Sequence, residues 1–168
     1  MSIKEEPAHD SVAHDSVTRD QGRTFPTIRE LTADESRALL ARNHVGRIAF
    51  AVDDRVDIHP IHYVSDENWL YGRTNHGSKF ATLARHAWCA FEVDEVRGVF
   101  DWDSVVVKGH MELLDPELGS PDSYARGLEL MRSLVAATFT EADPVPQRSI
   151  LFRLHVSELT GRAARLEP

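Results

Sequence analysis

The stretch Val45-Gly-Arg-Ile-Ala-Phe-Ala-Val-Asp-Asp-Arg-Val-Asp-Ile-His-Pro-Ile-His-Tyr-Val64 decides the fold class. Apolar residues alternate through residues 46–52, and several residues between them are also apolar, which predicts a strand buried on much of both faces. The pair Asp53-Asp54 predicts a hairpin turn, so a second strand follows over residues 55–64. Proline cannot donate to a strand ladder, so Pro60 places this second strand at an edge or a bulge, where backbone groups remain available to another partner.

Four more strands are predicted after this hairpin, over residues 69–74, 87–93, 104–114 and 149–159. Three helices are predicted, over residues 32–42, 80–85 and 121–138. The first begins with a capping box and the third with a serine followed by proline, which are both helix-start signals. Six strands joined mostly as sequential hairpins, with three helices, predict a mainly β fold: a closed or partly closed antiparallel barrel with helices packed against it.

Composition and charge narrow the class of protein. The chain has 168 residues, of which 42% are hydrophobic and 27% charged, and this suits one compact domain. Residues 1–24 contain few large apolar groups, so we expect a disordered tail followed by a single domain over residues 25–168. The formal net charge of -8 argues against a nucleic-acid partner, because binding to phosphate backbones requires a basic face.

Other features bear on the compartment and on metal binding. No apolar run approaches the roughly 18 residues of a membrane span, so we expect no membrane association and a cytoplasmic location. The single cysteine, Cys89, excludes an intrachain disulfide and a zinc site built on thiolates. His59 and His62 are three residues apart on a strand and point to opposite faces, so they cannot bind one metal ion together. We therefore predict no metal site.

Motifs for catalysis by side chains alone are weak. The serines lie outside any glycine-flanked nucleophile elbow, and no glutamate–histidine metal motif is present. Asp57 and His59 share a strand face and could form a dyad, although a solvated polar pair is the commoner outcome. If the protein is an enzyme, we expect a cofactor to supply the chemistry.

A candidate phosphate site lies in Leu70-Tyr-Gly-Arg-Thr-Asn-His-Gly-Ser-Lys79. A strand is predicted to end at Arg73 or Thr74 and a helix to begin near Ser78, so two cations, two hydroxyls and a glycine meet at a strand-to-helix junction. Helix-terminal amides, hydroxyl donors and fixed positive charge are what a phosphate requires. The alternative, which this stretch taken alone favours, is an ordinary capped helix with surface charge.

Several blocks together resemble the pyridoxamine 5'-phosphate oxidase-like family of flavin-binding split barrels, and within it the flavin-nucleotide-binding and nitroimidazole-resistance-like branch. The resemblance extends over residues 32–114 and 156–162. Its specificity comes from the order and spacing of the blocks. They are Gly46-Arg-Ile-Ala49, His59-Pro-Ile-His-Tyr63, Leu70-Tyr-Gly-Arg-Thr74, Gly77-Ser-Lys79 with Leu83, Phe91-Glu-Val-Asp94, Trp102-Asp-Ser-Val-Val-Val-Lys-Gly109 and Glu158-Leu-Thr-Gly-Arg162.

The resemblance implies a homodimer with FMN in a cleft at the dimer interface. The residues implied for the FMN phosphate are Arg73, Thr74, Ser78 and Lys79. The backbone implied to line the isoalloxazine ring is that of His59, Pro60, Ile61 and His62. Trp102 and Ser104 are implied to reach the flavin held by the other subunit, although Trp102 could equally be a hydrophobic plug. Arg162 is either a ligand or, as exposed arginines more often are, a surface charge.

The chain also departs from the family pattern. Residues 153–168 do not show the basic residues that grip the substrate phosphate in true vitamin oxidases, so we do not expect oxidation of pyridoxamine phosphate. Asp101 and Asp103 flank Trp102 where the family commonly has glycine-tryptophan-serine. Carboxylates beside a flavin would disfavour an anionic reduced form unless they point to solvent.

The leading hypothesis is an FMN-dependent oxidoreductase acting on a small molecule such as a nitro compound or a quinone. His59 and His62 are the candidate proton donors near the ring. One alternative is a reductase that uses a deazaflavin in place of FMN. A second alternative, from another functional class, is a non-catalytic flavin or haem carrier or sensor.

Overall fold

The computed structural model describes residues 25–52, 54–75, 88–117 and 119–166. The predicted tail over residues 1–24, the helix predicted over residues 80–85, and the candidate phosphate ligands Ser78 and Lys79 lie outside the described residues.

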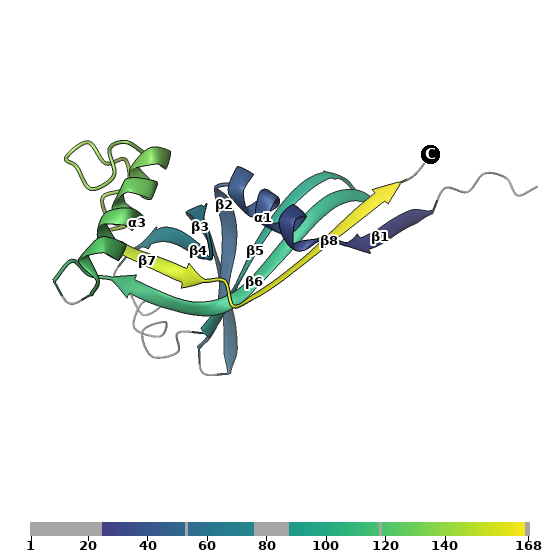
Figure 1. Ribbon diagram of the computed structural model, residues 1–168, viewed down its shortest axis with the longest axis horizontal. Coiled ribbons are helices and arrows are strands. Elements are labelled where there is room, and N and C mark those ends of the chain that lie inside the picture. Colours follow the sequence, from purple (N-terminus) through teal and green to yellow (C-terminus); the bar gives the residue numbers. More distant parts are fainter. Residues whose placement is uncertain (1–24, 53, 76–87, 118, 167–168) are drawn as a thin grey trace, which may run out of the picture.

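The described chain is mainly antiparallel β-sheet with two helices, which confirms the predicted fold class (Figure 1). The strands are β1 (Pro26–Glu30), β2 (Val45–Val52), β3 (Arg55–Asp66), β4 (Trp69–Thr74), β5 (Trp88–Gly98), β6 (Asp101–Leu114), β7 (Ile150–His155) and β8 (Glu158–Leu166). The helices are α1 (Ala33–Arg42) and α3 (Pro121–Leu134).

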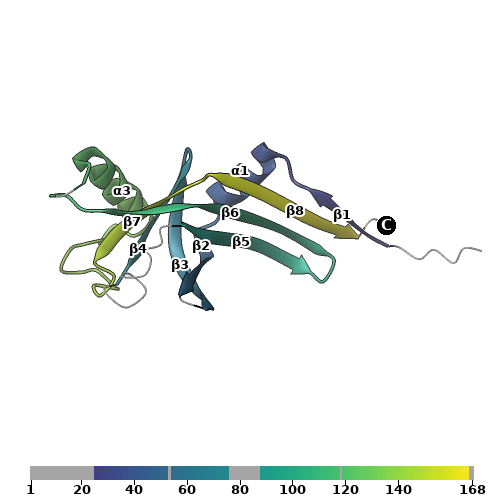
Figure 2. The same cartoon turned by 90° about the horizontal axis from the view of Figure 1, so that it is seen from below.

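Six of the strands close into a barrel. The sheet order is β1-β8-β6-β5-β2-β3-β4-β7, and an additional pairing of β7 with β6 completes the circle from β6 through β5, β2, β3 and β4 to β7. The other two strands, β8 and β1, extend the sheet beyond β6. We call β1, β8 and residues 92–108 of the β5–β6 hairpin the arm. The arm and α3 lie at opposite ends of the elongated molecule (Figures 1 and 2).

Strand β6 serves both the arm and the barrel because it changes partner at Gly109. Residues 102–108 of β6 pair with β8, and residues 111–114 pair with β7. A Cβ atom on Gly109 would lie 1.7 Å from the carbonyl oxygen of His155. The Ser157 N–H donates to the Lys108 carbonyl oxygen at 3.1 Å. The chain leaving β7 therefore crosses directly over a glycine, and this crossing divides the single strand predicted over residues 149–159 into β7 and β8.

The arm also differs from the sequence-based expectation in length. Strand β1 was not predicted because four of its five side chains are exposed, so it carries no alternating apolar pattern. The β5–β6 hairpin extends to Gly98 and Asp101, beyond the strand ends predicted at residues 93 and 104. These residues are held in place by strand pairing and ion pairs rather than by burial of apolar side chains.

The helices begin as their caps predict. The Thr32 hydroxyl accepts from the Glu35 N–H at 3.2 Å, and the Glu35 carboxylate accepts from the Thr32 N–H at 2.8 Å. Leu39 and Leu40 on α1 are buried in the barrel core. Helix α3 packs on a second core cluster that includes Tyr71 of β4, and ends at Leu134 rather than Thr138. Neither helix is long and apolar enough to cross a membrane.

Candidate functional site

The barrel wall opens between β3 and β4. These strands pair only from Tyr63 with Gly72 to Asp66 with Trp69. Beyond that point β3 continues along β2, while β4 continues along β7 as far as Thr74. The two strands therefore separate as they leave the shared ladder, and this separation is the split in the barrel.

Pro60 lies on the side of β3 that faces the split. The Tyr63 N–H donates towards β2, to the His44 carbonyl oxygen at 3.0 Å. Because successive residues of a strand direct their N–H groups to opposite edges, the nitrogen of Pro60 faces away from β2, where the β4 ladder has not begun. Proline therefore costs no ladder hydrogen bond here, as expected for a strand edge.

A pocket of about 330 Å³ occupies the split, within the range typical of small-molecule sites. We call it the split pocket. Its apolar lining comes from the barrel core: Ile48, Phe50, Ile61, Met111 and Phe152. Its remaining lining comes from the middle of β3, the end of β4 and the loop before β7: His59, Pro60, Arg73, Thr74, Asn75, Gln147 and Arg148. The structure thus gathers five predicted site residues, His59, Pro60, Ile61, Arg73 and Thr74, at one pocket.

The two candidate histidines have different surroundings. The His59 side chain packs against the Phe50 ring, with 5.7 Å between ring centroids, and its Nε2 lies 3.9 Å from Oδ2 of Asp57. His62 is exposed and pairs in register with Val45. It does not line the split pocket. Only His59 of this pair can therefore reach a ligand in that pocket through its side chain.

Arg73 lines the split pocket, but its guanidinium is already bound by a carboxylate. The residue is 5% exposed, and its Nη1 and Nη2 donate to the two carboxylate oxygens of Asp143 at 2.5 and 3.2 Å. The same carboxylate accepts from the N–H groups of Phe139 at 2.8 Å and Val145 at 3.0 Å. Hydrogen bonding from Arg73 first, and from these amides, holds the pKa of Asp143 well below its usual range. The pair ties β4 to the loop over residues 135–149.

Arg148 and Gln147 line the split pocket without having been predicted. They lie on the same loop, directly before β7, and the Arg148 side chain is partly buried. Within the described parts of the chain, the Arg148 guanidinium has no hydrogen-bond or ion-pair partner. The signal that could have found Arg148 is the pairing of β4 with β7, because that register brings the start of β7 beside Thr74.

A second pocket, of about 480 Å³, lies on the arm. We call it the arm pocket. Its lining includes three further candidates of the sequence analysis, Trp102, Ser104 and Arg162. Ser104 and Arg162 are direct partners in the β6–β8 ladder, and the Ser104 hydroxyl donates to Oε1 of Glu92 at 3.2 Å. The predicted site residues therefore form two groups in two pockets of the chain, rather than one group.

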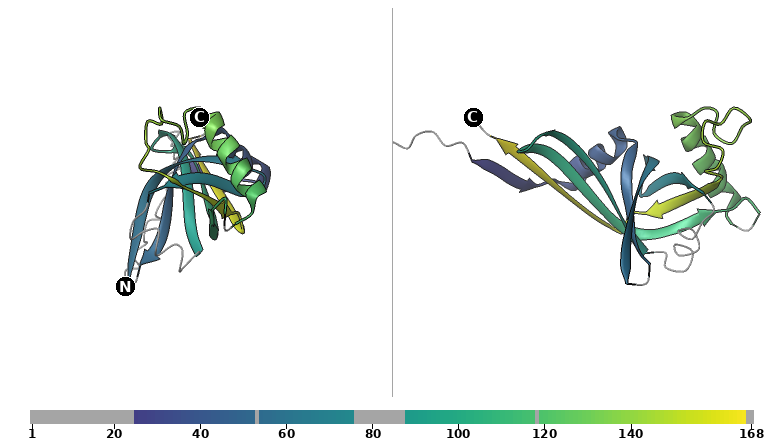
Figure 3. Two further views of the ribbon diagram at one scale, coloured as in Figure 1. Left: turned by 90° about the vertical axis from the view of Figure 1, so that its left-hand side faces the viewer. Right: turned by 180° about the vertical axis from the view of Figure 1, so that it is seen from behind.

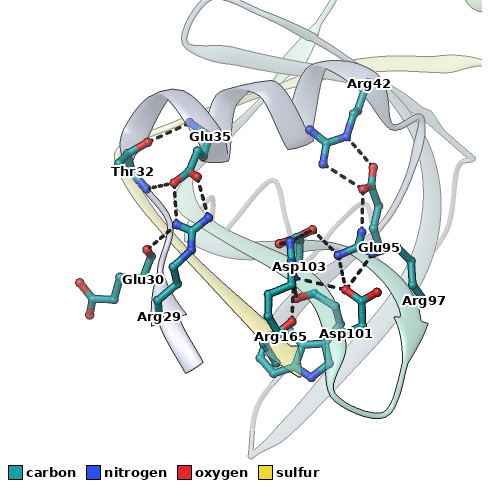
Figure 4. Close-up of polar contacts among 12 residues, drawn as sticks. Arg29, Glu30, Thr32, Glu35, Arg42, Glu95, Arg97, Asp101, Asp103 and Arg165 are labelled. Carbon is teal, nitrogen blue, oxygen red and sulfur yellow. Dashed lines mark hydrogen bonds and ion pairs between the residues drawn. The ribbon is translucent and has the colours of Figure 1, made fainter. Parts of the chain in front are cut away.

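The carboxylates beside Trp102 are held by arginines (Figure 4). Asp103 is buried, and it accepts from Arg97 at 2.7 Å and from Arg165 at 2.6 and 2.8 Å. Burial alone would raise the pKa of Asp103, but the hydrogen bonds from the two arginines outweigh it and keep that pKa below its ordinary value. Asp101 accepts from Arg97 at 3.0 Å. The negative charges of Asp101 and Asp103 are therefore matched by arginines within the arm.

The network continues to α1 through Glu95. This carboxylate accepts from Nε of Arg42 and from the Asn43 amide, each at 2.7 Å. Hydrogen bonding from Arg42 is the main cause that lowers the pKa of Glu95 to about 2. The arm is thus joined to the end of α1 by partly exposed ion pairs.

Comparison with known proteins identifies the family. Residues 32–163 match the profile of the family described as pyridoxamine 5'-phosphate oxidase. The chain belongs to this family, which confirms the resemblance found in its sequence.

Individual relatives agree with this assignment. An uncharacterized protein of Rhizobium meliloti is 27% identical over 146 residues, which are 82% of this chain and 95% of that protein. The crystal structure of a FAD-binding protein from Mesorhizobium loti is 27% identical, with a TM-score of 0.67 over 82% of this chain and 99% of that one. The FAD binding protein from Mycobacterium smegmatis is 24% identical, with a TM-score of 0.57 over 83% of this chain and all of that one, and it shares the fold. The split-barrel fold and membership of a flavin-binding family are therefore established.

Proposed function

We propose that this protein binds FMN and acts as an oxidoreductase on a small molecule. The observation that carries the proposal is the composition of the split pocket. Its lining combines the apolar residues Ile48, Phe50 and Phe152 with the polar residues Thr74 and Arg148. A flat aromatic ring system joined to a phosphate has this same division into an apolar and an anionic part, so the residues present fit the cofactor.

The residues around the pocket suggest how the cofactor would be held. The open edge of β3 at Pro60 offers backbone groups to the ring, and Thr74 offers a hydroxyl to the phosphate. Ser78 and Lys79 remain predicted phosphate ligands. Bound FMN would supply the electron transfer that no protein side chain provides. His59 is the better candidate proton donor, because its side chain faces the pocket and that of His62 does not.

We also propose that the functional unit is a homodimer. The arm projects away from the barrel (Figure 3), and its pocket holds Trp102 and Ser104, which do not line the split pocket of the same chain. A second copy could bring these residues to the flavin. Large apolar side chains on the sheet also favour a partner, since monomeric proteins rarely expose contiguous apolar patches of this kind. Ile58 is 61% exposed, and Val56, two residues away on the same face of β3, is also exposed.

FAD is a second candidate cofactor, because the Mesorhizobium loti relative is named as a FAD-binding protein. The visible spectrum of the purified protein, followed by fluorescence titration with FMN, FAD and riboflavin, tests the proposal. Mass spectrometry of any released ligand separates FMN, FAD and a deazaflavin. We expect bound flavin or uptake of added FMN, and the absence of both would contradict the proposal.

Activity requires a separate measurement. Flavin reduced on the protein should be reoxidised faster by a quinone or a nitro compound than the same flavin in solution. Equal rates would favour a carrier or sensor over an oxidoreductase.

A further inference from the structure

We infer that Arg148 binds the phosphate of the ligand in the split pocket, and that Arg73 is a positioning residue that holds the loop carrying Arg148. The inference deepens the proposed flavin function and rests on it. It differs from the expectation drawn from the sequence, in which Arg73 was one of four predicted phosphate ligands and Arg148 was not predicted.

Arg73 is poorly suited to bind an added phosphate. Two of its guanidinium nitrogens donate to Asp143, and the Phe139 ring lies against the guanidinium, with 5.3 Å from Cζ to the ring centroid. The Asp143 side chain is 1% exposed. The positive charge of Arg73 is therefore compensated inside the protein, and withdrawing it would leave a buried carboxylate without its counter-charge.

The Arg73–Asp143 pair nevertheless controls where Arg148 lies. Asp143 accepts from the Val145 N–H at 3.0 Å, and the Val145 carbonyl oxygen accepts from the Arg148 N–H at 3.0 Å. A short series of hydrogen bonds thus leads from the buried end of β4 to the backbone of Arg148. Fixing that backbone reduces the conformational freedom that the side chain would otherwise lose on binding.

The strand register places Arg148 at the predicted phosphate site. The β4–β7 ladder ends where Thr74 pairs with Ile150. Arg148 precedes Ile150 by two residues, so it lies beside the end of β4, where Thr74 and Asn75 also line the pocket. The predicted strand-to-helix junction begins at this same point of the chain.

Arg148 also differs from Arg73 in the partners of its guanidinium. Of the two arginines known to line the split pocket, Arg73 is paired, while the Arg148 guanidinium has no hydrogen-bond or ion-pair partner among the residues described. A guanidinium presents a planar fork of donors that matches phosphate oxygens, and it stays charged at any physiological pH. A residue that binds phosphate requires unpaired donors and an uncompensated positive charge. The buried Arg73–Asp143 pair provides neither.

The test compares FMN with riboflavin, which has the same ring system and lacks the phosphate. Fluorescence titrations are made on the full-length protein and on Arg148→Ala, Arg148→Lys and Arg55→Ala. Arg55 is the matched control, because it is exposed, lies at the start of β3 and lines neither pocket. We expect Arg148→Ala to weaken FMN by about 10- to 100-fold, the range for one charge-assisted contact, and to leave riboflavin within about 2-fold. Arg148→Lys should recover part of the loss, and Arg55→Ala should change neither affinity.

Two results would overturn the assignment of Arg148. Equal weakening of FMN and riboflavin would show that Arg148 acts on the ring or on folding, and unchanged FMN affinity would show that it does not bind the phosphate. If the wild type binds neither flavin, the proposed function fails. Calorimetry with inorganic pyrophosphate then decides the inference by itself: binding that Arg148→Ala abolishes supports the anion site, and binding that is absent or unaffected rejects it.

The positioning role of Arg73 is tested by a double-mutant cycle. Asp143→Asn should weaken FMN in the wild-type background, because it loosens the loop, and should cause little further loss when Arg148 is already alanine. Additive losses would contradict the positioning role, since they would mean that the buried pair acts on the ligand by a route independent of Arg148.

Discussion

The split pocket and the arm use arginine in opposite ways. In the arm, Arg97 and Arg165 converge on Asp103, and Glu95 binds Arg42 of α1, so the charges are matched in partly exposed pairs (Figure 4). At the split, one arginine is buried in a pair and a second, Arg148, lines the pocket unpaired among the described residues. The difference shows that the role of an arginine depends on which groups already form hydrogen bonds or ion pairs with its guanidinium. The same criterion singles out Arg162 in the arm pocket, which also has no polar partner in the described chain.

The largest expected effect separates the buried pair from the exposed ones. Arg73→Met leaves the Asp143 carboxylate buried without its counter-charge, so the melting temperature should fall by on the order of 10 °C. The matched change in an exposed pair is Arg29→Met, where Arg29 and Glu35 are 48% and 41% exposed. It should cause a much smaller shift, because solvent screens the pair. Similar shifts for both variants in a calorimetric scan would remove the distinction between the two regions.

The next largest effect on stability is expected at Gly109, where β6 passes from the arm into the barrel. Gly109→Ala would place a Cβ atom 1.7 Å from the His155 carbonyl oxygen, so the β7–β8 crossing must move. We expect the free energy of unfolding to fall by about 1–3 kcal/mol, as in other overpacked sites. Gly98→Ala is the control, since its nearest heavy atom would be the Asp101 Cβ at 3.8 Å, an ordinary contact. Urea denaturation measures both variants, and equal stabilities would contradict the described crossing.

The smallest effect tests the arm's surface network. Glu95→Gln should lower the free energy of unfolding by about 0.2–1 kcal/mol at neutral pH. Because folding lowers the pKa of Glu95 from 4.5 to about 2, its contribution is fully present above pH 4.5 and is lost as the pH falls through about 2. The stability difference between wild type and variant should therefore be constant at neutral pH and shrink below pH 4.5. A difference that grows on acidification would contradict the assigned ion pair.

Local patterns predicted most of the barrel. Alternation gave the bounds of β2 and β4, the capping box gave the start of α1, and Pro60 indicated the open edge of β3. The division of β7 from β8 could not be predicted, because it depends on the crossing over Gly109, a contact between distant segments.

The site was predictable to a similar degree. The family resemblance implied that His59, Pro60, Ile61 and Thr74 lie at one site, and these residues line the split pocket. The binding of Arg73 by Asp143 did not, because these residues are 70 positions apart and meet only through the β4–β7 pairing. The pairing of Asp103 with Arg165 escaped prediction for the same reason.

The central claim is that the split pocket of one chain and the arm pocket of another form one flavin site. Mixing two defective variants, Arg148→Ala and Trp102→Ala, under conditions that allow subunit exchange tests it most directly. Each mixed dimer would hold one site with both substitutions and one with neither, so an equal mixture should recover about one quarter of the wild-type FMN sites. Recovery of about that fraction in an FMN titration is the predicted result. No recovery after verified exchange would contradict a site shared between two chains.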